Sequence, residues 1–413
     1  MIRRIEALRY RCLRDVAQEL HGFQVLVGPN ASGKSTFLDV LHLLSDILNN
    51  GLQKAAFRRS PNPHSLFWME QAASFEVAVE FEIPKEKRQN GFTRARYEVA
   101  LGLDTQEQFS VLAESLWLKP DQDAPTIIQR CLFPSPTPPR ASLMSKSGGG
   151  TTKGWRNIIS KKAEGDNHYF KAETTGWNNP FRLGPYRLGL SNLPEDEERF
   201  PVAIWVKRVL MEGIHKLVLN GEAMRNPSPV GSSFEFQADG SNLPWVLETL
   251  RKRRERYNRW IAHVKTALPD VRSIETVEKP EDKSRYLRVS YANGLKAPSW
   301  SLSDGTLRLL ALVLLAYLDN AGGVFLVEEP ENGIHPQAVE TVFQSLSSSL
   351  SSQILCASHS PVVLSLSKPE QVLCFARTED GVTDIIRGSD HPNLRDWRQT
   401  SDLGTLFATG ILG

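Results

Sequence analysis

The sequence of 413 residues predicts an α/β fold with a mostly parallel core sheet, an antiparallel N-terminal β lobe and an inserted helical subdomain. Near the start, the apolar run 23–27 leads through a glycine-rich loop into 37–44, where apolar residues recur at helical spacing. After residue 300, short apolar strands alternate with helices, an order typical of a parallel sheet covered on both faces. Residues 75–83 alternate apolar and polar, which predicts antiparallel pairing and one solvent-facing side.

The glycine-rich loop at 28–36, GPNASGKST, fits the phosphate-binding pattern G-x-x-x-x-G-K-[ST]. A strand before it and a helix after it direct backbone N–H groups into one concavity, which suits triphosphate oxygens. We expect Lys34 to reach the β and γ phosphates and the Ser35 hydroxyl to sit on Mg²⁺. The flanking strand and helix disfavour the alternative, an ordinary glycine turn. The predicted ATP contacts here are Asn30, Ala31, Ser32, Gly33, Lys34, Ser35 and Thr36.

Composition places the chain among ordinary globular proteins, with 40% hydrophobic and 23% charged residues. We find neither an apolar run near the ~20 residues of a membrane span nor a signal-peptide core, so a cytoplasmic protein without membrane contact is expected. The four cysteines lack C-x-x-C spacing, which predicts reduced thiols and neither a zinc site nor a disulfide framework. A net charge of +2 does not by itself indicate nucleic-acid binding.

Composition also divides the chain into four predicted segments. The first carries the phosphate loop and strands at 74–83, 94–103 and 110–118. The second is rich in proline and glycine and is expected to have low order, and the third holds helices at 202–219 and 244–268. We find no heptad pattern long enough for a long coiled coil. The segments are 1–120, 121–180, 181–285 and 286–413.

Helix 244–268 has a basic face that includes Arg251, Arg253 and Arg254. These side chains are candidates for nucleic-acid contact, although a solvated helix face is the commoner explanation. A second candidate group follows the low-order segment: Lys153, Arg156, Lys161 and Lys162.

Two acids follow the predicted buried strand 324–327, at the end where open α/β sheets bind ligands. We assign Glu328 to Mg²⁺, usually through water, and Glu329 to the attacking water as its general base. The alternative is a pair of solvated loop acids. After the next strand, 353–357, His359 could sense the γ-phosphate, although a lone histidine there is more often structural.

A second anion site is predicted at 302–306, LSDGT, which precedes the helix 307–318. Since the chain already has one phosphate loop, Ser303, Asp304 and Gly305 make sense if they face the nucleotide of another copy. The alternative is a plain N-cap by Ser303 or Asp304.

In this order, 28–36, 302–306, 324–329, 331–336 and His359 resemble the Walker A, signature, Walker B, D-loop and switch-histidine motifs of ABC-type ATPases. The chain is most similar to the SMC/RecF/OLD-like branch, including AAA_21-type proteins with an E-E-P-E-N-x-x-H-P run. Residues 5–13 also resemble that branch's opening strand, where an arginine such as Arg9 approaches the nucleotide. The resemblance implies an ABC-type P-loop NTPase with ATP and Mg²⁺, in which two copies dimerise around the nucleotide.

Three positions depart from the ABC pattern. Glu328 stands where aspartate is usual, the signature reads LSDGT rather than LSGGQ, and the conserved glutamine of ABC proteins could be Gln53 or Gln71. The long separation of Lys34 from Ser303 disfavours a transporter ATPase.

The sequence stops soon after His359 and carries no nuclease motif that we recognise, so we expect a separately encoded effector, a nuclease. The resemblance further implies a role in antiphage defence or DNA processing. Two alternatives stay open, an ATP-binding regulatory or scaffold subunit with little turnover and a transporter-coupled ATPase.

Overall fold

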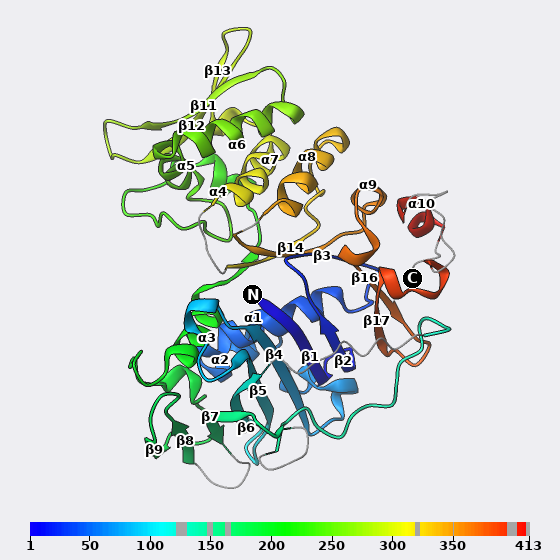
Figure 1. Ribbon diagram of the computed structural model, residues 1–413. Coiled ribbons are helices and arrows are strands. Elements are labelled where there is room, and N and C mark those ends of the chain that lie inside the picture. The colour runs from blue at the N-terminus through cyan, green and yellow to red at the C-terminus, as the bar shows by residue number, and fades with distance from the viewer. Residues whose placement is uncertain are drawn as a thin grey trace.

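The computed structural model describes residues 1–120, 130–146, 152–161, 167–318, 323–349, 351–394 and 403–409. Its centre is a six-stranded sheet of order β10-β14-β15-β3-β16-β17 (Figure 1). Neighbouring strands are parallel except β16 and β17, which are antiparallel, so the predicted mixed sheet is confirmed. The strands are β3 (Phe23–Val27), β10 (Ile214–Leu217), β14 (Val324–Glu328), β15 (Gln353–Ala357), β16 (Val372–Arg377) and β17 (Thr383–Arg387).

Strand β3 contributes side chains to two separate hydrophobic cores, because successive side chains of a strand point to opposite faces. Leu26 packs on one side with the N-terminal β lobe and α1 (Lys34–Asn50). Val25 and Val27 pack on the other side with the helical subdomain. Both faces are covered, which explains why these strands are uniformly apolar.

The N-terminal lobe is an eight-stranded antiparallel sheet of order β2-β1-β4-β5-β6-β7-β8-β9. Helices α1, α2 (Leu52–Phe57) and α3 (Pro201–Glu212) contribute to the core on its inner side. The strands are β1 (Ile2–Tyr10), β2 (Leu13–Glu19), β4 (Ser74–Glu82), β5 (Phe92–Leu103), β6 (Phe109–Pro120), β7 (Arg156–Lys161), β8 (Asn167–Lys171) and β9 (Asn178–Arg182).

The antiparallel pairing predicted for β4 is confirmed. The prediction that one side of this strand faces solvent is wrong. Glu76 and Glu80 are buried. Residues 140–145 cover this face, and the Leu143 N–H donates to the Glu76 carboxylate at 2.5 Å. Glu80 accepts from the Arg96 guanidinium at 3.0 Å. The polar residues of the alternating pattern therefore form a buried ionic layer.

The low order expected of 121–180 is also wrong for the part that the structure describes. Strands β7 and β8 lie within it and extend the antiparallel sheet, and β9 begins there. Residues 130–146 lack regular secondary structure, as their proline content predicts, but they lie against the sheet. The glycine run 148–150 falls outside the described residues.

The helical subdomain joins helices α4 to α8 to a small antiparallel sheet (Figure 1). The predicted helix 244–268 is interrupted at Arg253, whose φ of −102° and ψ of 75° are not helical. The predicted helix 202–219 becomes α3 followed by β10, because the chain enters the central sheet at Ile214. The elements are α4 (Gly221–Arg225), α5 (Leu243–Lys252), α6 (Arg254–Ala267), α7 (Asp304–Leu314), α8 (Pro336–Ser347), β11 (Val271–Glu278), β12 (Arg285–Tyr291) and β13 (Lys296–Pro298).

The described residues hold two further short α-helices, α9 (Pro361–Ser365) before β16 and α10 (Leu403–Ala408) after β17. Among the helices of the described residues, none combines the length and the apolar character that crossing a bilayer requires.

Candidate nucleotide-binding site

The glycine loop follows β3 and ends where α1 begins at Lys34. Its backbone enters the left-handed region at Ala31, with a φ of 61°, and at Gly33, with a φ of 102°. A Cβ atom at Gly28 would lie 2.1 Å from the Phe375 carbonyl oxygen, so only glycine fits there. The Thr383 hydroxyl on β17 donates to the Ser32 carbonyl at 2.9 Å and so ties the loop to the central sheet. No sequence motif marks this threonine.

Lys34 lies inside the loop, with only 6% of its surface exposed. Its Nζ donates to the carbonyl oxygens of Gly28 and Pro29, each at 2.8 Å. Burial lowers the pKa of Lys34 to about 8, against the opposing effect of the Glu329 and Glu328 carboxylates. The ammonium is therefore held in the concavity by weak neutral acceptors that phosphate oxygens can replace.

Ser35 and Glu328 converge from different ends of the chain. The Ser35 hydroxyl donates to Glu328 Oε2 at 2.5 Å, and Lys216 Nζ lies 3.0 Å from Glu328 Oε1. A hydroxyl and a carboxylate at this separation are the hard oxygen ligands that Mg²⁺ prefers, so these two residues fit the ion. Lys216 comes from the edge strand β10, and sequence reasoning missed it.

Glu329 directly follows β14 and adopts a φ of 50°, which is unusual for glutamate. Its N–H donates to the Ala357 carbonyl at 2.8 Å, so the neighbouring strand holds the backbone in this conformation. The carboxylate lies 3.5 Å from the Asn332 amide nitrogen. This conformation ends the strand at its carboxyl end, where the Glu329 carboxylate is close enough to Lys34 to favour the charged ammonium.

His359 lies beyond β15, beside the same edge of the sheet. Glu331 Oε1 accepts from the Ser358 hydroxyl at 2.7 Å and from the His359 N–H at 3.1 Å. Burial and the nearby Lys34 charge lower the pKa of His359, which favours the neutral imidazole. Glu331 therefore positions the histidine loop, a role that its place in the sequence did not reveal.

The signature-like turn begins α7. Ser303 is its N-cap and is exposed to solvent, and its hydroxyl oxygen accepts from the Thr306 N–H at 3.2 Å. Asp304 pairs with Arg225 at 2.6 Å. A Cβ at Gly305 would lie 2.6 Å from the carbonyl oxygen of Gly333, so the turn packs closely against the D-loop-like segment.

Arg308, one helical turn further along α7, donates to the Asn332 carbonyl at 2.8 Å. The start of α7 and the segment after Glu329 therefore form one connected unit within the subunit.

Arg9 lies near the carboxyl end of β1. Its guanidinium donates to the Ala141 carbonyl at 3.4 Å, and it lines a cavity of about 400 Å³ together with Gln71. Gln53 instead donates its side-chain amide to the Phe109 carbonyl at 2.8 Å. The two glutamine candidates thus occupy different surroundings, one beside Arg9 and one fixed to the N-terminal sheet.

The basic candidates lie in different environments. Arg251 lies 3.5 Å from Glu248, while Arg253 and Arg254 are exposed where α5 ends and α6 begins. The prediction that Lys161 contacts phosphate is wrong, because its side chain is buried and donates to the Val111 carbonyl. Lys162 lies outside the described residues.

Comparison with known proteins agrees with this geometry. The family model AAA_21, described as "AAA domain, putative AbiEii toxin, Type IV TA system", matches residues 23–365. No curated protein sequence matches the chain.

Two solved structures of SMC heads have the same fold. One is an SMC head bound to the C-terminal winged-helix domain of ScpA, with a TM-score of 0.55 and 13% identity over 93% of this chain and 96% of that one. The other is an SMC head with an extended coiled coil bound to the C-terminal domain of ScpA, derived from Pyrococcus furiosus. It has a TM-score of 0.52 and 12% identity over 93% of this chain and 95% of that one. The chain therefore belongs to the AAA_21 family, and its fold is that of an SMC-like ABC-type ATPase.

Proposed function

We propose that the chain binds and hydrolyses ATP in the cytoplasm, and that two copies dimerise around the nucleotides. The observation that carries the proposal is the convergence of Lys34, Ser35 and Glu328, with Glu329 beside the lysine. These residues are far apart in the sequence, and the fold brings them together at the carboxyl ends of the strands of the central sheet.

Each side chain has a distinct task in this proposal. Lys34 binds the β and γ phosphates, while Ser35 and Glu328 would hold Mg²⁺, which supplies charge neutralisation when bound. Glu329 accepts the proton of the attacking water as general base. His359, neutral and fixed through Glu331, donates a hydrogen bond to the γ-phosphate and so distinguishes ATP from ADP.

The dimer part of the proposal rests on the start of α7. Ser303 offers a hydroxyl and a helix N-terminus to solvent, and Gly305 and Arg308 connect this turn to the segment that follows Glu329. A nucleotide of a second copy, contacted by Ser303, Asp304 and Gly305, would thus influence the geometry of the general base.

The dimer is further proposed to control a separately encoded effector, a nuclease, in antiphage defence or DNA processing. The similar SMC heads are bound to domains of ScpA, which supports a separate protein partner for this head-like fold as well.

Glu329→Gln tests the dimer, because it removes the base while preserving size and hydrogen bonding. With ATP and Mg²⁺, light scattering on a sizing column should give twice the monomer mass, and phosphate release should fall about a thousandfold. Ser303→Arg in the same background should restore the monomer, while the exposed Lys85→Ala should not. A monomeric Glu329→Gln variant that still binds ATP would refute the dimer.

A second candidate is an ATP-binding regulatory subunit with little turnover. The ion pair of Glu328 with Lys216 favours it, because the lysine competes with Mg²⁺ for the carboxylate. Phosphate release that is low in the wild type and unchanged in Glu329→Gln would establish this candidate instead.

A further inference from the structure

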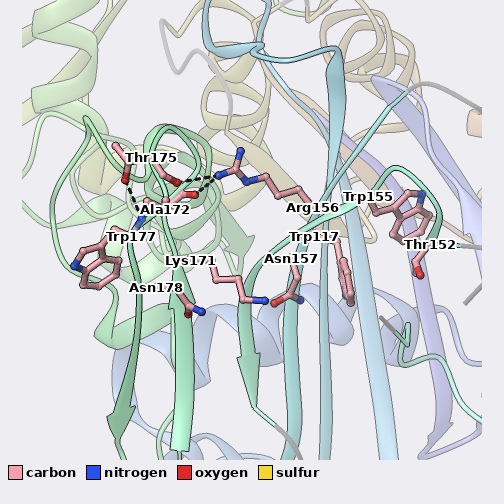
Figure 2. Close-up of a pocket in the computed structure, with 11 residues that line it drawn as sticks. Trp117, Thr152, Trp155, Arg156, Asn157, Lys171, Ala172, Thr175, Trp177 and Asn178 are labelled. Carbon is pink, nitrogen blue, oxygen red and sulfur yellow. Dashed lines mark hydrogen bonds between the residues drawn. The ribbon is translucent and has the colours of Figure 1, made fainter. Parts of the chain in front are cut away.

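The far end of the eight-stranded sheet contains a cavity of about 500 Å³ that the nucleotide site does not use. It lies among β6, β7 and the turn between β8 and β9 (Figure 2). The glycine loop instead follows β3, a strand of the central sheet. Its volume is in the range of small-molecule sites.

A pair of buried polar side chains forms one wall of this cavity. Trp117 and Asn157 are cross-strand partners on β6 and β7, and they are 3% and 9% exposed. Neither the Trp117 indole N–H nor either polar atom of the Asn157 amide has a hydrogen-bond partner within the chain that the structure describes. Buried amides are almost always paired in proteins. These three orphaned atoms beside the cavity are themselves covered, so a ligand can pair with them once the side chains over them shift.

A β-bulge places these two groups side by side. The register shifts between Leu116, which pairs with Ile159, and Trp117, which pairs with Asn157. An extra residue in β7 re-aims the side chains that follow, and such bulges are common beside functional sites.

The rest of the cavity is aromatic and basic. Trp155 packs edge-on against Trp117, with ring centroids 6.2 Å apart and an interplanar angle of 69°. Lys171 is exposed on β8, and Figure 2 shows its ammonium and the Asn157 amide directed into the same space. Arg156 is held at the rim by the carbonyl oxygens of Ala172 and Thr175, at 2.6 and 3.2 Å.

We propose that this cavity binds an unpaired nucleobase together with its phosphate. The Asn157 amide offers a donor and an acceptor to the edge of the base, as asparagine does to adenine, and the Trp117 N–H offers a second donor. The half-buried Trp155 indole, with the Lys119 ammonium 4.8 Å from its ring centroid, provides the apolar surface on which an unpaired base stacks. Lys171 provides the charge for the phosphate. The base can come from a free nucleotide or from a single strand of nucleic acid.

The test uses the full-length chain with Lys34→Met, which removes triphosphate binding at the glycine loop. The probes are the four nucleoside monophosphates, followed by calorimetry, and fluorescein-labelled ten-nucleotide single strands of DNA and RNA, followed by anisotropy. At least one probe should bind, and Asn157→Ala should weaken it about tenfold through two lost hydrogen bonds. Lys171→Ala should weaken it about threefold and reduce the salt dependence.

Two variants keep this result interpretable. Asn157→Asp preserves the shape of the side chain but replaces its donor, so it should also weaken binding if the fold is intact. Lys85→Ala removes an exposed lysine outside the cavity and should bind the probe as the parent does.

The outcomes separate the two sources of the base. Monophosphates that bind as tightly as the oligonucleotides indicate a free nucleotide, while binding of oligonucleotides alone indicates a nucleic-acid strand. The proposal is overturned if no probe binds, if duplex DNA binds as tightly as single strands, or if Asn157→Asp and Lys171→Ala both bind like the parent. None of these outcomes depends on the ATPase proposal, because the parent variant already lacks Lys34.

Discussion

ATP binding should take up a proton at mildly alkaline pH, because of the state of Lys34. Burial holds the pKa of this lysine at about 8. Phosphate oxygens around the ammonium favour its charged form and should return the pKa to its ordinary range, near 10 or above. A lysine that is partly neutral before binding is then fully protonated after it.

The size of the effect follows from the pKa. At pH 8.5 about a quarter of the free lysine is charged, so binding should take up about three-quarters of a proton. At pH 7 only about one-tenth of a proton should be taken up, and the affinity for ATP should be about fourfold higher than at pH 8.5. Calorimetry with a non-hydrolysable ATP analogue, in buffers of different ionisation enthalpy, measures the uptake as a slope.

Two variants assign the proton to Lys34. Lys34→Met should abolish the uptake, and His359→Ala should preserve it, because that imidazole is already neutral at this pH. A slope near zero at pH 8.5, or proton release, would refute the reasoning. The same lowered pKa means that the unfolded chain binds more protons between pH 8 and 10.5, so the contribution of Lys34 to the free energy of unfolding should rise across this window.

Glu331→Ala should lower phosphate release about a hundredfold while leaving ATP affinity unchanged, because it frees the loop that carries His359. Filter binding and a phosphate assay on one preparation separate the two effects, and an equal loss of both would contradict the positioning role. Gly305→Ala should destabilise the protein by about 1–3 kcal/mol in urea unfolding, because its Cβ would meet the Gly333 carbonyl. Gly176→Ala is the matched control, since nothing lies within 4 Å of a Cβ there, and equal stabilities would rule out the clash.

The central sheet could be predicted where a short, wholly apolar run lies between clear turn signals. Strands β3 and β15 have the predicted bounds, and β14 extends the prediction by one residue, to Glu328. Here local sequence and tertiary burial agree, because both faces of each strand are covered. The convergence of Ser35 with Glu328 was expected from the motifs, and their contact is present.

The sequence predictions failed where a segment distant in the chain determines the surroundings of a side chain. The alternation around Glu80 matched a solvated face, because nothing near it in the chain shows that Arg96 and Lys119 supply buried counter-charges. Lys216 belongs to no motif and reaches Glu328 only because β10 pairs with β14.

The break at Arg253 has no proline or glycine to announce it. It results from packing, since α5 lies on β11 and β12 while α6 lies on α8.

The interleaved order of the central sheet has a consequence for how the protein is made. Strand β3 pairs with β15 and β16, so Phe23 cannot form its strand pair until Ile354 has been synthesised. The side chain of Gln353 also forms hydrogen bonds with the backbone of Ile2 and of His21. A ribosome must therefore release most of the polypeptide before the nucleotide-binding edge can assemble, and contacts this distant in the chain form slowly. A nascent or truncated chain would expose an apolar strand on both faces.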